Sequence, residues 1–253
     1  MEKPAKYIFE RTSSSGSDDN SFNDRNKFGL DFLFRKNFLE RKEDIIFKYS
    51  LYFLLIIYSV GIAGHLIPEM RNLMIALTPA TLFITGSVVL FNIFSKGNKK
   101  LLFWMIFIFA VTFTAEVIGV HTGLVFGSYT YGDVLGVRLF SVPLIIGLNW
   151  VLIILGAILL ANKITGNLIA SALIAGFLAF VFDFILEPSA VNLGYWSWEG
   201  GVIPLQNYIS WFSLAFVSGL LFNLMKIKVA SKLPVYYLLI QSVFFLTLLF
   251  FID

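Results

Sequence analysis

Hydrophobic residues fall in long runs that are separated by short polar breaks. Each run has about the 20 residues that a helix needs to cross the hydrocarbon core of a bilayer. Apolar and polar residues do not alternate within the runs, as they do in the strands of a membrane β-barrel. The pattern therefore predicts an all-α, polytopic membrane bundle of about seven transmembrane helices, over residues 46–66, 73–94, 101–120, 139–161, 168–186, 207–225 and 233–251.

The first 45 residues differ from the rest of the chain. They are polar, carry charges of both signs and include a group of serines near Ser13, a composition typical of disordered segments. An interfacial helix is expected around Phe28–Phe38, where Phe and Leu alternate with Arg35 and Lys36. We therefore divide the chain into a largely disordered tail, residues 1–45, and a transmembrane helical domain, residues 46–253.

The basic residues indicate an orientation, because cytoplasmic loops of membrane proteins are enriched in Lys and Arg. With a cytoplasmic N-terminus, 17 of the 19 basic residues lie on the cytoplasmic side, and only Arg71 and Arg138 lie outside. An odd number of spans then places the C-terminus outside. We expect a multi-pass protein of the cell's inner (cytoplasmic) membrane, with the lipid bilayer as its surroundings.

The composition excludes several classes of function. Only 14% of the residues are charged, against about 25% in soluble domains. The chain has no cysteine, which excludes disulfides, thiol catalysis and cysteine metal sites. No basic stripe interleaved with aromatic residues suggests a nucleic-acid partner. The two histidines do not have the spacing of a metal motif, so no metal is predicted.

Three acidic residues near the outer ends of the predicted spans are the strongest candidates for chemistry. Glu116 and Asp183 each lie inside an apolar run, where an acid is costly to ionise and usually faces the bundle interior. Glu187 follows Asp183 by four residues and shares its helix face, and Pro188 is expected to end that helix at Glu187. A neutral carboxylic acid in an apolar pocket suits general-acid catalysis. The alternative is that these acids only cap helices or reach the interface.

Other polar and aromatic residues gather at the same outer ends. The histidines there are more often hydrogen-bond partners than catalysts, and the aromatic rings could belong to the usual interfacial belt. Aromatic faces can also stabilise a cation. The further candidates for a shared pocket are His65, His121, Tyr129, Tyr131, Arg138, Trp196, Trp198, Asn207 and Trp211.

Two stretches, residues 115–150 and 183–211, carry a pattern that resembles a known family. The elements of the pattern are Glu116, Gly119, Thr122–Gly123, Phe126–Gly127, Tyr129, Tyr131, Leu135–Gly136, Pro143 and Trp150, then Asp183, Glu187–Pro188, Gly194, Trp196, Trp198, Pro204–Leu205, Asn207–Tyr208 and Trp211. Together they resemble the carotenoid biosynthesis membrane proteins, a family that includes carotenoid 1,2-hydratases. Glu187 departs from the pattern, because many members have Asp before the proline.

The resemblance implies a cofactor-independent hydratase that adds water to the terminal C=C of an acyclic carotenoid end of the lycopene or γ-carotene type. An acid protonates the alkene, and water captures the tertiary carbocation. Either Glu116 or Asp183 is the candidate acid, while the other, with Glu187, stabilises the cation and orients water. The expected substrate-binding residues are His121, Tyr129, Tyr131, Trp196, Trp198, Asn207 and Trp211, of which His121 and Asn207 would position the water.

The sequence leaves two other functions open. A carotenoid end-group cyclase uses the same cation but captures it with an internal alkene. A carotenoid-binding or transport protein would carry the polyene without chemistry. Association with other carotenoid enzymes is also left open. Product mass separates the two reactions, because hydration adds one water and cyclisation adds nothing.

Overall fold

A computed structural model describes residues 44–94 and 97–252 of the chain. Residues from Ile46 onward form one unit by their internal contacts. The predicted tail lies outside the described residues except for its last two positions, and so does the interfacial helix expected around Phe28–Phe38. Both therefore stay predictions.

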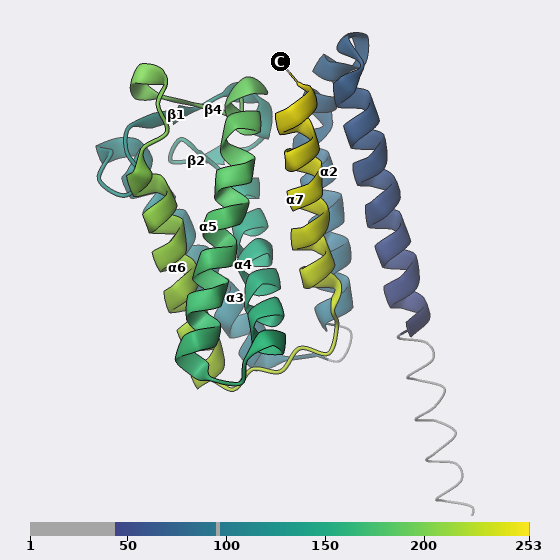
Figure 1. Cartoon of the computed structure of the whole chain (residues 1–253), viewed down its shortest axis with the longest axis vertical. Coiled ribbons are helices and arrows are strands. Elements are labelled where there is room, and N and C mark those ends of the chain that lie inside the picture. Colours follow the sequence, from purple (N-terminus) through teal and green to yellow (C-terminus); the bar gives the residue numbers. More distant parts are fainter. Residues whose placement is uncertain (1–43, 95–96, 253) are drawn as a thin grey trace, which may run out of the picture. The chain divides into compact units, whose positions relative to one another are not determined.

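The described residues contain seven helices that are long and apolar enough to cross a membrane. The chain is thus a multi-pass membrane protein, and the predicted helical bundle is confirmed. The first helix starts at the end of the bundle opposite to the one where α7 ends (Figure 1). The helices are the first helix (Asp44–Leu66), α2 (Pro68–Phe94), α3 (Lys99–Thr122), α4 (Leu144–Ile164), α5 (Leu168–Asn192), α6 (Leu205–Leu224) and α7 (Leu233–Phe251).

Helix α4 is the central helix, because most of its residues are buried and it packs against α2, α3, α5 and α7. Helices α5 and α6 pack extensively against each other through small residues. A Cβ atom added at Gly219 would lie 3.3 Å from the Cα atom of Ala172, and one at Gly176 would lie 2.9 Å from the carbonyl oxygen of Phe212. Small residues of this kind let helices of membrane bundles approach closely.

Helix α4 begins five residues later than predicted. Strands β2 (Arg138–Leu139) and β3 (Val142–Pro143) pair as a short antiparallel hairpin just before it. The two turn residues, Phe140 and Ser141, have positive φ angles of 50° and 68°. Two left-handed residues match the twist of a two-residue hairpin. The apolar composition of this hairpin hid it within the predicted span.

Pro188 does not end α5, so that prediction is wrong: the helix continues to Asn192. Proline inside a helix removes one backbone hydrogen bond. Backbone hydrogen bonds after Pro188 nevertheless hold the last turn of α5 in place. Gly194 adopts a left-handed φ of 71°, and the N–H of Tyr195 bonds the carbonyl of Ala190 at 2.9 Å. This left-handed cap ends the helix and reverses the chain.

Two loops at one end of the bundle are joined by a ribbon of two strands. Strand β1 (Tyr129–Tyr131), after α3, pairs antiparallel with β4 (Trp196–Trp198), after α5. Short 3₁₀ turns, η1 (Asp133–Leu135) and η2 (Glu199–Gly201), follow the two strands. The ribbon lies at the end of the bundle where α7 ends (Figure 1), which is the end that we predict to be extracytoplasmic.

Candidate active site

Three carboxyl groups are buried beneath the ribbon. Glu116 lies in the second-last turn of α3, and Asp183 and Glu187 lie one turn apart on α5. Their exposed fractions are 4%, 1% and 2%. Burying a carboxyl group costs free energy unless it forms hydrogen bonds. The hydrogen-bond partners of each carboxyl therefore determine which chemistry the site can support.

The ribbon presents four aromatic side chains to the carboxyls. Its register pairs Tyr129 with Trp198 and Tyr131 with Trp196. Because side chains alternate between the faces of a strand, these four residues share one face. The residues between them, Thr130 and Ser197, are exposed and lie 3.1 Å apart through their hydroxyl oxygens. The ribbon thus covers the site with aromatic rings and shows small polar side chains outside.

Glu116 accepts hydrogen bonds from the two tyrosines of the ribbon. The hydroxyls of Tyr129 and Tyr131 both donate to Glu116 Oε2, the latter at 2.8 Å. Burial, with the nearby Glu116 carboxyl as the next cause, raises the pKa of both tyrosines well above its usual value. Both phenols therefore stay protonated and keep donating. A Cβ added at Gly119 would lie 2.7 Å from the Phe126 ring, so only glycine allows this approach.

Glu187 receives the two tryptophans. The indole nitrogens of Trp196 and Trp198 donate to Glu187 Oε2 at 2.9 and 2.8 Å. The amide nitrogen of Asn207, at the start of α6, donates to Glu187 Oε1 at 3.0 Å and also to Asp183 Oδ2 at 2.6 Å. Asn207 therefore links the two acids of α5.

Asp183 receives the fewest hydrogen bonds of the three acids, because among the described residues only Asn207 donates to it. Its Oδ1 atom is buried and has no hydrogen-bond partner among the described residues. A buried polar atom without a partner is rare in folded proteins and calls for a specific reason. A ligand, a water molecule or a proton on this oxygen would supply one.

The carboxyls and the aromatic rings enclose a pocket of about 20 Å³. That volume is close to the minimum needed for one water molecule. Trp211 of α6 stacks on Trp150 of α4 at 3.5 Å between ring centroids, and it also stacks on Phe126 at 5.0 Å. We call this the carboxyl pocket; its lining residues are Glu116, Phe126, Tyr129, Tyr131, Ile146, Trp150, Asp183, Glu187, Trp196, Trp198, Asn207 and Trp211.

Nine of the twelve candidates from the sequence line this pocket, and His65, His121 and Arg138 do not. His121 is exposed on the last turn of α3 and does not reach the pocket, so we leave it out of the proposed site. Sequence reasoning missed Trp150, Phe126 and Ile146 as pocket residues. Trp150 and Phe126 belong to the family-like pattern, but nothing in the pattern said which way their rings point.

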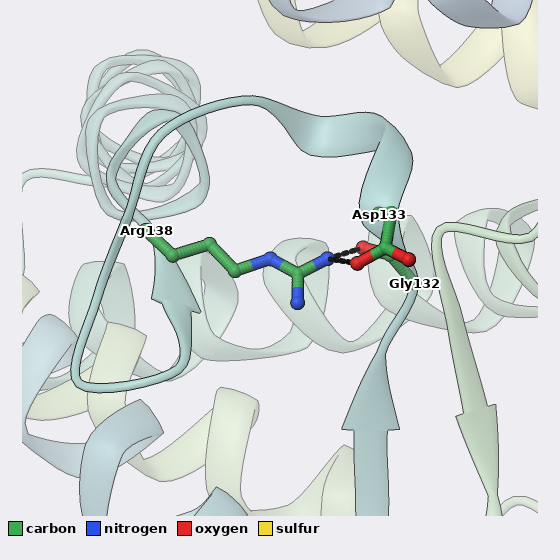
Figure 2. A network of polar contacts seen from close by, with 3 residues as sticks. All are labelled: Gly132, Asp133 and Arg138. Carbon is green, nitrogen blue, oxygen red and sulfur yellow. Dashed lines mark hydrogen bonds and ion pairs between the residues drawn. The ribbon is translucent and has the colours of Figure 1, made fainter.

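Arg138 also lies apart from the carboxyls. Its guanidinium Nη2 lies 2.9 Å from Asp133 Oδ1 and donates to the carbonyl of Gly132, as Figure 2 shows. Both contacts join the first residue of β2 to the loop that precedes it. Asp133 is fully exposed, and such exposed pairs contribute little free energy. Arg138 therefore shapes the loop and takes no part in the carboxyl pocket.

The pocket is suited to proton chemistry more than to metal binding. Both oxygens of Glu187 and the Oε2 atom of Glu116 accept from N–H and O–H donors. The residues that the structure describes include no group of three His, Asp or Glu side chains arranged to hold a metal ion. A carboxyl with one free oxygen, beside room for water and between aromatic faces, can hand a proton to an apolar ligand.

Comparison with known proteins finds a family and a relative. Residues 77–252 match the model of a family described as "Carotenoid biosynthesis protein". The chain is also similar to a bisanhydrobacterioruberin hydratase of Haloarcula japonica, with 36% identity over 116 residues. That match covers 43% of this chain and 40% of the length of the relative. No solved structure matches the chain.

Proposed function

The chain belongs to the carotenoid biosynthesis protein family, and from this premise we propose that it is a carotenoid hydratase, a hydro-lyase that adds water across the terminal C=C of an acyclic carotenoid end. The observation that carries the proposal is the buried Asp183 with its free Oδ1 atom, beside a pocket of one-water size. The name of the Haloarcula japonica relative, a hydratase, supports the same reaction class.

Asp183 is the proposed acid because of the donors around the three carboxyls. Glu187 accepts from three N–H groups and Glu116 Oε2 from two hydroxyls, whereas Asp183 accepts from one amide. Donors favour the charged form of a carboxyl, so the acid with the fewest donors keeps its proton most readily. A carboxylate accepts such bonds with both oxygens, whereas a protonated carboxyl spends one oxygen as a donor. Asp183 Oδ1 can carry a proton without losing a hydrogen bond.

The proposed reaction conserves every atom of the two substrates. The proton of Asp183 Oδ1 adds to the less substituted carbon of the terminal double bond, whose π electrons form the new C–H bond. The tertiary carbocation that results is captured by the oxygen of a water molecule, which forms the C–O bond. The surplus proton of that water returns to the Asp183 carboxylate. The net change is addition of one water, without oxidation or reduction.

The surroundings of Asp183 favour the cation. The carboxyl oxygens of Glu116 and Glu187 supply partial negative charge, and the rings of Trp196 and Trp150 supply aromatic surface. Each such face stabilises a desolvated cation by about 2 kcal/mol. The ribbon excludes bulk water, so the reactive cation meets one held water. A space of one-water size beside the acid supports capture by water over capture by a folded internal alkene.

The test is the pigment made by a lycopene-producing host that carries the gene. Wild type should yield pigment with the mass of one added water per reacted end. Asp183→Asn should lower that product at least about a hundredfold, since a general acid contributes about 10²–10⁴ in rate. Asp133→Asn, the same change at an exposed loop acid, is the matched control and should keep full conversion.

Two results would refute the proposal. The first is normal conversion by Asp183→Asn protein that inserts in the membrane. The second is a wild-type product of unchanged mass: a cyclised pigment would assign cyclisation, and unaltered but bound pigment would assign a carrier.

A further inference from the structure

A second, larger cavity adjoins the carboxyl pocket. Its volume is about 190 Å³, and it lies between the first helix, α2, α4 and α7. The two cavities share three wall residues, Ile146, Trp150 and Trp196. A ligand that fills the larger cavity therefore contacts residues that line the carboxyl pocket together with Asp183 and Glu187.

The larger cavity opens between the first helix and α2. Val60 of the first helix and Leu77 of α2 both line it, yet they are 57% and 45% exposed. These apolar residues belong to membrane-spanning helices, so the opening faces lipid. Nearer the other end of the same helices, the amide of Asn92 donates to Ser50 at 2.8 Å, which holds the two helices together there.

The polar groups of the cavity wall are mostly bonded to each other. Gln241 Nε2 donates to Asn149 Oδ1 at 2.9 Å, and the Tyr195 and Thr78 hydroxyls lie 2.9 Å apart. These pairs leave the cavity with a mainly apolar surface. A ligand there must therefore be mainly hydrocarbon.

His65 is the polar exception. Its side chain is 3% exposed, and its Nδ1 donates to the carbonyl of Gly61 at 2.7 Å. The Nε2 atom is then a bare acceptor, and it has no partner among the described residues. An O–H group, from water or from a newly formed tertiary alcohol, is the donor that suits it.

Building on the hydration proposed above, we propose that this cavity is an end-group chamber: it binds the acyclic isoprenoid end of the polyene, which enters from the bilayer between the first helix and α2. A cavity of about 150 Å³ holds one benzene molecule. The chamber therefore has room for a short branched hydrocarbon end but not for a whole carotenoid. The remainder of the polyene, about as long as the hydrocarbon core is thick, stays in the lipid.

The test blocks the mouth of the chamber and measures bound pigment as well as product. Leu77→Trp places a bulky ring at the opening. Leu73→Trp makes the same change one turn earlier on α2, at a residue that is 54% exposed and does not line the cavity. The proteins are purified in detergent from the lycopene-producing host, and the visible absorbance of retained polyene is compared with protein amount.

We expect Leu77→Trp to lower both retained polyene and hydrated product at least about fivefold, because overfilling an apolar site is unfavourable. Leu73→Trp should match wild type in both measurements. Should Leu77→Trp protein fail to fold, as judged by size-exclusion chromatography, Val60→Trp replaces it, with Ile56→Trp as its exposed control.

The two proposals fail in different ways. Equal polyene retention by Leu77→Trp and Leu73→Trp would overturn the chamber while leaving hydration intact. A fivefold loss of retained polyene, in a protein whose wild type never changes the pigment mass, would support the chamber and refute hydration. Wild-type protein that retains no polyene would overturn the chamber.

Discussion

The carboxyl groups of Glu116, Asp183 and Glu187 share burial but differ in the donors that they meet. Two phenols donate hydrogen bonds to Glu116, two indoles and an amide donate to Glu187, and one amide donates to Asp183. Chemically similar side chains are thereby given different capacities to release a proton. The proposed division of roles follows from these partners.

The indole donors of Glu187 provide a first prediction. Trp198→Phe removes one of the two N–H groups on Glu187 Oε2. A hydrogen bond to a charged group is worth about 1.5–3 kcal/mol, so hydrated product should fall about tenfold to a hundredfold. Trp104→Phe is the control, because Trp104 donates to the carbonyl of Ser218 outside the pocket. Equal conversion by the two variants, measured by pigment mass, would contradict a role for the indole in the site.

The phenol donors of Glu116 provide a prediction about pH. Burial raises the pKa of Tyr129 and Tyr131, so the neutral, donating forms persist past the ordinary phenol value of about 10. Raising the pH to about 10 therefore ionises neither tyrosine. Membrane vesicles assayed at rising pH should show no loss of conversion that depends on these hydroxyls. A loss below pH 10 in wild type that is absent from the Tyr129→Phe, Tyr131→Phe double variant would sink this assignment.

Among the elements, the β1–β4 ribbon organises the site. Its antiparallel register sets four aromatic residues toward the carboxyls and leaves Thr130 and Ser197 outside. The hydrogen bonding between the two loops extends one residue beyond the ribbon, where the N–H of Gly132 donates to the carbonyl of Tyr195 at 2.8 Å. A Cβ atom added at Gly132 would lie only 2.0 Å from the carbonyl oxygen of Gly194. The ribbon that covers the three carboxyl groups therefore requires glycine at position 132.

Gly132→Ala should accordingly loosen the ribbon. We expect a loss of about 1–3 kcal/mol in the free energy of unfolding, the usual cost of forcing extra atoms into a packed place. Thermal unfolding in detergent would measure it. Gly166→Ala is the control, because a Cβ atom there meets nothing within 4 Å. Equal midpoints for the two variants would show that the ribbon tolerates the added methyl group.

For the whole molecule, the distribution of basic residues predicts a cytoplasmic N-terminus and a C-terminus outside. The seven helices of spanning length within residues 44–94 and 97–252 agree with ends on opposite sides. Alkaline phosphatase fused after Asp253 folds only outside the cytoplasm and should be active. Green fluorescent protein fused at the same point should be dark after export. A fluorescent fusion with inactive phosphatase would reverse the orientation and place the carboxyl pocket at the cytoplasmic face.

The sequence by itself determined the membrane bundle and most residues of the carboxyl pocket. A helix needs a long apolar run to cross a bilayer, so each span can be recognised from its own stretch of sequence. An acid inside such a run, like Glu116 or Asp183, is conspicuous for the same reason. The family-like pattern added the aromatic residues of the two outer loops.

The tertiary structure alone decided how these residues meet. Strands β1 and β4 pair across a long separation, since Thr130 and Ser197 lie 67 positions apart in the chain. The continuation of α5 past Pro188, the exposure of His121 and the free oxygen of Asp183 depend on which neighbours fold against each group. The same holds for the cavity beside Trp150 and Trp196. Hydropathy records how apolar a residue is, whereas a site is made by the directions in which side chains point and the partners they find there.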